Sequence, residues 1–133
     1  MRKQTLIAVV LLLAVLLCGG CGGSAAQADL SWPDNENTAG VPRPTTQAAI
    51  TQVIDENGLT NITYGDVPMA EAKVYLTQLK DAGFTEVESS TDIKETISYV
   101  ATNPDSRTHL CFNYNSDGTM AVSLDRISFN SVK

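Results

Sequence analysis

The candidate chemistry in the second half of the chain begins with His109 and Cys111, which are separated by one residue. Alternate residues of a strand point to the same side, so the imidazole and the thiol would lie within reach of each other. A cysteine nucleophile needs a nearby base and an orienting group, and zinc needs further ligands, for which carboxylates such as Asp125 are the candidates. Such pairs also arise by chance in any strand. We therefore predict no catalytic, metal-binding or cofactor-binding residue, and keep an enzyme that uses His109 and Cys111 as the alternative.

A short apolar run near the N-terminus precedes two further cysteines. Arg2 and Lys3 make the start of the chain positive, and residues 6–17 are apolar without interruption, which is the layout of an export signal. A helix that crosses a bilayer needs about 20 apolar residues, and glycines interrupt this run earlier. We predict a signal peptide over residues 1–20, with an uncleaved anchor as the alternative.

The two cysteines stand in the sequence Cys18-Gly19-Gly20-Cys21. Cleavage of a signal peptide favours small residues just before the cut; glycines precede Cys21, whereas leucines precede Cys18. A redox or metal-binding Cys-x-x-Cys pair would need a folded support, which these glycines do not supply. The stretch resembles the lipobox of bacterial lipoproteins, in which an aliphatic residue and two small residues precede a cysteine that receives diacylglycerol, although Cys18 occupies the aliphatic position. The resemblance implies that Cys21 is lipidated and anchors the chain to the membrane.

The charge of the chain excludes two classes of partner. Removal of residues 1–20 leaves 113 of the 133 residues, which suits one domain. The whole chain has nine basic and fifteen acidic residues, and the signal takes Arg2 and Lys3, so the mature chain has seven basic residues against fifteen acidic ones and a net charge of −8. Nucleic acids and anionic lipid headgroups are bound through positive patches. We therefore predict that the protein binds no nucleic acid and no lipid headgroups peripherally.

Residues 21–47 are predicted to form a lipidated tether rich in glycine, serine and proline. Small and polar residues dominate, and Pro33, Pro42 and Pro44 prevent regular strand pairing, so we expect this segment to be extended or disordered. Trp32 is unusual in such a segment, because it would expose a large apolar ring to water. It either folds back to cap the edge of the domain core or serves as a docking anchor for a partner protein.

Residues 48–133 are predicted to form one α+β domain. Segments rich in β-branched residues and bounded by turn signals indicate strands. The expected strands cover residues 48–55, 59–64, 84–89, 95–102, 108–115 and 119–129. Asn57-Gly58 and Asp117-Gly118 are strong hairpin signals, and Pro104 suits a type I turn. Tight turns between consecutive strands imply antiparallel pairing.

Between the second and third expected strands, the periodicity becomes helical over about residues 68–82. The apolar stripe consists of Met69, Ala72, Leu76 and Leu79. Gly83 is placed to end the helix in a left-handed conformation. The predicted fold is α+β, with one helix packed on one face of an antiparallel sheet of about five or six strands and the order β-β-α-β-β-β-β.

Strand alternation separates a core face from an opposite face. The predicted core residues of the last two strands are Leu110, Phe112, Tyr114, Met120, Val122 and Leu124. The opposite face carries His109, Cys111 and Asn113. We expect it to be solvated or covered by a partner, because antiparallel sheets commonly leave one side wet.

Short motifs from about residue 30 onward carry a broader resemblance. They are Trp32-Pro33, Val41-Pro42-Arg43-Pro44, Ala82-Gly83-Phe84-Thr85, the stretch YVATNPDSRTHLCFNY and the stretch MAVSLDRI. Together with the lipobox, these motifs make the chain similar to a family of small, uncharacterised bacterial lipoproteins. The resemblance implies an exported, lipid-anchored protein with a single domain, and it supplies no catalytic residues.

The sequence thus predicts a lipoprotein held on the extracytoplasmic side of the cell membrane through lipid on Cys21. We expect a non-enzymatic binding or interaction module, with an envelope protein as its candidate partner. The expected interaction surface comprises Trp32, His109, Cys111 and Asn113.

Overall fold

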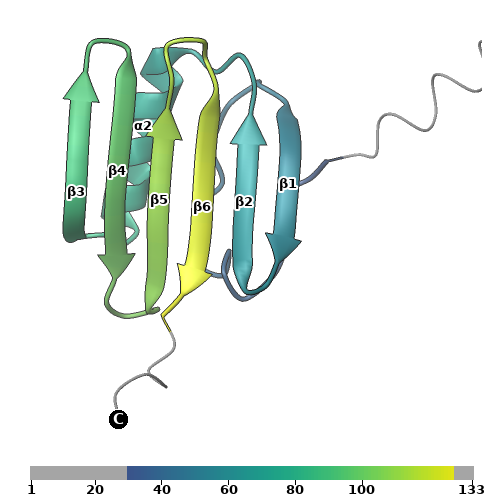
Figure 1. Cartoon of the computed structure of the whole chain (residues 1–133), viewed down its shortest axis with the longest axis vertical. Coiled ribbons are helices and arrows are strands. Elements are labelled where there is room, and N and C mark those ends of the chain that lie inside the picture. Colours follow the sequence, from purple (N-terminus) through teal and green to yellow (C-terminus); the bar gives the residue numbers. More distant parts are fainter. Residues whose placement is uncertain (1–29, 128–133) are drawn as a thin grey trace, which may run out of the picture. The chain divides into compact units, whose positions relative to one another are not determined.

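The computed structural model describes residues 30–127, and one compact unit begins at Ser31. Its elements are β1 (Ile50–Glu56), β2 (Leu59–Tyr64), α2 (Met69–Asp81), β3 (Glu86–Ile93), β4 (Thr96–Asn103), β5 (Thr108–Tyr114) and β6 (Met120–Arg126). The strands form one antiparallel sheet in the order β1-β2-β6-β5-β4-β3, and α2 lies behind it in Figure 1. The predicted fold class and element order are confirmed. The predicted signal peptide and Cys21 lie outside the described residues.

The predicted turn residues form the turns that connect neighbouring strands of the sheet. Asn57 and Gly58 have φ angles of 53° and 78°, as the tight hairpin between β1 and β2 requires. In the hairpin between β5 and β6, Gly118 has a φ of 85°. The backbone N–H of Thr119 donates to the Asp117 carboxylate at 2.9 Å, and this hydrogen bond holds the pKa of that carboxyl below its usual value.

The prediction was least accurate for β3. This strand starts two residues later than expected and continues to Ile93, because it pairs with β4 as far as the Ile93 and Thr96 partners. The pairing also has a register shift between Val87 and Ser89, which makes Glu88 the extra residue of a bulge.

Helix α2 ends as its sequence predicts. Gly83 has a φ of 107°, and its N–H donates to the Lys80 carbonyl at 3.1 Å. The N–H of Phe84 donates to the Leu79 carbonyl at 3.2 Å, which completes a Schellman motif. Phe84 is fully buried, so the chain leaves the helix directly into the core.

The core lies between α2 and the facing side of the sheet. All six core residues predicted on β5 and β6 are buried. The helix contributes three buried side chains, Ala72, Tyr75 and Leu79, while Met69 and Leu76 pack against the core from partly exposed positions. The rings of Tyr75 and Phe112 meet at 6.0 Å between centroids, which couples the helix to the centre of β5.

The segment of residues 31–42, here called the strap, differs from the predicted tether. Trp32 and Val41 are 9% and 8% exposed and belong to the core cluster. Asn37 donates through its side-chain amide to the Gly58 carbonyl at 2.9 Å and to the Thr60 hydroxyl at 3.1 Å. The strap was expected to be extended or disordered. Instead, the side chains of Trp32 and Val41 are buried, and the side-chain amides of Asn35 and Asn37 donate to the β1–β2 hairpin.

Tyrosine hydroxyls fasten loops to the core. Tyr75 donates to the Pro42 carbonyl at 3.0 Å, Tyr99 donates to the Phe84 carbonyl at 2.8 Å, and Tyr114 donates to the Val67 carbonyl at 2.8 Å. Burial raises the pKa of Tyr75 and, to a lesser extent, that of Tyr99. Their hydroxyls therefore stay protonated and able to donate.

Candidate functional site

The sheet face opposite α2, here called the open face, carries short and mostly polar side chains. It includes Leu59, Asn61, Thr63, Glu88, Ser98, Val100, Thr102, His109, Cys111, Asn113, Ala121, Ser123 and Asp125, and it continues along β3 to Thr91 and Ile93. Cys111 lies at its centre, paired with Val100 of β4 and with Ser123 of β6. In Figure 1 this face is turned toward the reader, and no helix of the described chain covers it.

Side-chain hydrogen bonds within and between strands order this face. Asn61 donates to the Ser123 hydroxyl at 2.6 Å, and the Thr63 hydroxyl donates to the Asn61 carbonyl oxygen at 3.2 Å. The Asn113 amide lies 3.3 Å from the sulfur of Cys111, which is a free and half-buried thiol. The floor of the face is therefore a low, polar surface with its side chains held in place.

His109 lies between two carboxylates. Its Nδ1 is 3.0 Å from Oδ1 of Asp125, and its Nε2 is 3.5 Å from Oε2 of Glu88. The His109 side chain is 27% exposed, and those of Glu88 and Asp125 are 59% and 46% exposed. The bulge in β3 is what brings Glu88 to this position, since an extra residue re-aims a side chain that regular pairing would point elsewhere.

His109 and Cys111, the residues of the alternative enzyme hypothesis, have different side-chain neighbours. Both ring nitrogens of His109 face carboxylate oxygens, whereas the sulfur of Cys111 has the amide of Asn113 as its neighbour. The imidazole is thus held by charge on both sides and is not directed at the thiol. Over residues 30–127, no group of three or more His, Cys, Asp and Glu side chains is arranged to hold a metal ion.

The structure separates the four residues predicted as one interaction surface. His109, Cys111 and Asn113 lie together on the open face, as strand alternation predicts. Trp32 is buried in the core and offers little surface to a partner. Its burial agrees with the interpretation in which it folds back to cap the core.

Sequence analysis named Asp125 only as a candidate zinc ligand beside His109 and Cys111, and it missed Glu88 and the contact of both carboxylates with His109. Glu88 is the extra residue of a bulge, and no residue type near it marks the bulge in the sequence. Asp125 lies directly across from His109 in the β5–β6 register. Counting back from the Asp117-Gly118 turn would have placed it there, and that turn is the signal that was available.

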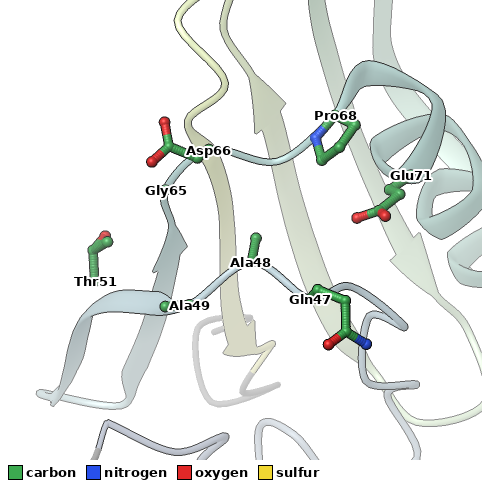
Figure 2. A pocket seen from close by; sticks show the side chains of 8 residues that line it. All are labelled: Gln47, Ala48, Ala49, Thr51, Gly65, Asp66, Pro68 and Glu71. Atoms are coloured by element: carbon green, nitrogen blue, oxygen red, sulfur yellow. The ribbon is translucent and has the colours of Figure 1, made fainter.

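A second feature is a shallow pocket of about 420 Å³ between the start of β1, the end of β2 and the N-terminus of α2. It is lined by Gln47, Ala48, Ala49, Thr51, Gly65, Asp66, Pro68 and Glu71. Figure 2 shows the carboxylates of Asp66 and Glu71 on opposite sides of Ala48. The Glu71 carboxylate accepts a hydrogen bond from the Thr46 hydroxyl, so it serves the attachment of the incoming chain to the helix.

Comparison with family models, with curated proteins and with solved structures gave no match for this chain. Among residues 30–127, no helix has the length and apolar character needed to cross a membrane.

Proposed function

We propose that this protein is a lipoprotein anchored to the extracytoplasmic side of the membrane through Cys21, and that it is a non-enzymatic binding module for an envelope protein. The open face is its contact surface. The single observation that carries the binding role is this face, which no helix among residues 30–127 covers and on which polar side chains are held in defined positions by hydrogen bonds within and between strands. The anchor is supported by the sequence alone.

Two features favour binding over chemistry at this face. His109 and Cys111 have separate partners, so the contacts among residues 30–127 place no base beside the thiol. The short side chains of Ser98, Cys111 and Ser123 also let another surface approach the middle of the face closely. Antiparallel sheets with one packed face leave the other for solvent or a partner.

The anchor is tested by the intact mass of the full chain purified from bacterial membranes. We expect the loss of residues 1–20 and an added diacylglyceryl group on Cys21. Cys18→Ala should be processed in the same way, whereas Cys21→Ala should keep its signal peptide. A chain that retains residues 1–20, or a processed chain without added lipid, would contradict the anchor.

The contact surface is tested by photo-crosslinking in intact cells. A photoreactive amino acid replaces Ser98 or Ser123 on the open face, and Val74 or Thr77 on the exposed side of α2 serves as the control. We expect discrete crosslinked products from the two open-face positions alone. Equal products from both sets, or products from the helix alone, would rule out the open face as the contact surface.

A further inference from the structure

The charged residues at the strand positions of the open face all have the same sign. Glu88 and Asp125 are negative, and these strand positions carry no lysine or arginine; Lys94 lies in the turn between β3 and β4, and Arg107 lies in the turn before β5. Both carboxylates converge on His109 and contact it through one oxygen each. A carboxylate has about four acceptor sites, so each retains the capacity to accept further hydrogen bonds.

The opposite end of the same face has a different character. A hollow of about 650 Å³ lies where β3 turns into β4. It is lined by Thr91, Ile93, Lys94, Glu95, Thr96 and Ser116. Ile93 is 62% exposed, which makes it the most exposed large hydrophobic residue of the described chain. The face therefore has an acidic end at Glu88 and, at the other end, a hollow in which Ile93 supplies the exposed apolar side chain.

The spacing of these two ends matches a short extended peptide. Glu88 and Ile93 are five residues apart on one strand, which corresponds to about 17 Å at about 3.4 Å per residue. An extended peptide of about six residues covers this distance. The floor between the two ends consists of side chains short enough to leave it room, such as Ser98 and Cys111.

We propose that the open face binds an extended, cationic segment of a partner protein, with a lysine or arginine at Glu88 and Asp125 and an apolar side chain in the hollow beside Ile93. This inference rests on the proposed binding function and names the chemistry of the partner. Opposite charge attracts such a segment and fixes its direction. A second copy of this chain would bring the same negative charges to the interface and be repelled.

The test uses the full chain, purified from membranes in a neutral detergent, and fluorescently labelled synthetic peptides. The main probe is a ten-residue peptide in which lysine alternates with serine and the last residue is leucine. A second peptide ends in serine instead. Affinity is measured by fluorescence anisotropy, and contact sites are mapped by carbodiimide crosslinking of peptide lysines to protein carboxylates.

We expect Glu88→Gln with Asp125→Asn to weaken binding of the main peptide about tenfold, since each exposed ion pair contributes up to about fivefold. The matched control, Asp34→Asn with Asp81→Asn, removes the same charge from the strap and from α2 and should change affinity less than about twofold. Crosslinks should map to Glu88 and Asp125. Equal losses in the two double variants, or crosslinks mainly at Asp34 and Asp81, would overturn the proposal as general charge attraction.

The hollow is tested separately. Ile93→Ser should weaken binding of the leucine-ended peptide about threefold and leave the serine-ended peptide unaffected; no difference would overturn the apolar half of the proposal. Thermal unfolding of each variant establishes that it folds. Because purified protein is used, failure here leaves the lipid analysis and the crosslinking in cells unaffected, so this proposal and the proposed function fail independently.

Discussion

Trp32→Ala tests whether the strap is part of the fold. The Trp32 side chain is 9% exposed and packs in the core cluster. A buried tryptophan covers about 150–250 Å², and replacement of a buried aromatic residue by alanine costs about 3–5 kcal/mol. The strap lies at the end of the domain and regains conformational freedom if it detaches, so we expect a loss near the lower limit, about 3 kcal/mol.

This loss is large against the total stability of about 5–15 kcal/mol that is typical of a small domain. Urea unfolding followed by far-ultraviolet circular dichroism measures it without depending on tryptophan fluorescence. Val74→Ala is the matched control: Val74 is 53% exposed on α2, so we expect a change below about 0.5 kcal/mol.

Hydrogen exchange gives a second measurement of the same prediction. The backbone N–H groups of Asn37 and Thr38 donate to the side-chain oxygen of Asn35 at 2.9 and 3.1 Å. If Trp32 holds the strap in place, both amides should exchange faster in Trp32→Ala. A loss of stability below about 1 kcal/mol together with unchanged exchange would refute the role of Trp32 in the core. That result would favour the alternative in which Trp32 is a docking anchor for a partner protein.

Three further predictions follow from the core and the open face. Burial raises the pKa of Tyr75 above its ordinary value of 10.0, so the unfolded chain loses this proton first. The free energy of unfolding should therefore fall above about pH 10 by about 1.4 kcal/mol per pH unit, and urea titrations should show a shallower alkaline slope in Tyr75→Phe. Gly83→Ala should cost about 2 kcal/mol, measured by urea unfolding, because φ is 107° and a Cβ would lie 2.8 Å from Nδ2 of Asn103; an unchanged midpoint would contradict this. His109→Gln should change the rate of Cys111 alkylation by iodoacetamide less than about twofold, whereas a tenfold drop would restore the enzyme alternative.

Local sequence chemistry accounts for most of the fold. The residue pair Asn57-Gly58 specifies a tight turn through its own backbone preferences, and Gly83 ends the helix for the same kind of reason. Alternation along β5 and β6 then determines which side chains face the helix. These signals depend on neighbours in the chain, so they are readable without knowledge of the fold.

The features that sequence analysis missed depend on contacts between distant residues. Proline and polar composition predicts no regular structure for the strap, and the strap indeed forms no helix or strand. Its order comes from Trp32 in the core and from Asn37 bonding to Thr60, which is 23 residues away. The same holds for Glu88, whose position beside His109 depends on a bulge in the pairing with β4. Composition alone does not distinguish an ordered coil from a disordered one.

The contrast between the two faces of the sheet indicates what kind of partner the open face suits. The inner face is apolar and is covered by α2 and the strap, as a permanent contact requires. A sheet face that is permanently covered by a partner protein would also be apolar, because obligate interfaces resemble a domain core cut in half. The open face instead carries Glu88 and Asp125 with roughly half of each side chain exposed. Exposed charges contribute more to the rate and direction of association than to its strength, so this surface suits a partner that binds and leaves, and its binding should weaken as salt concentration rises.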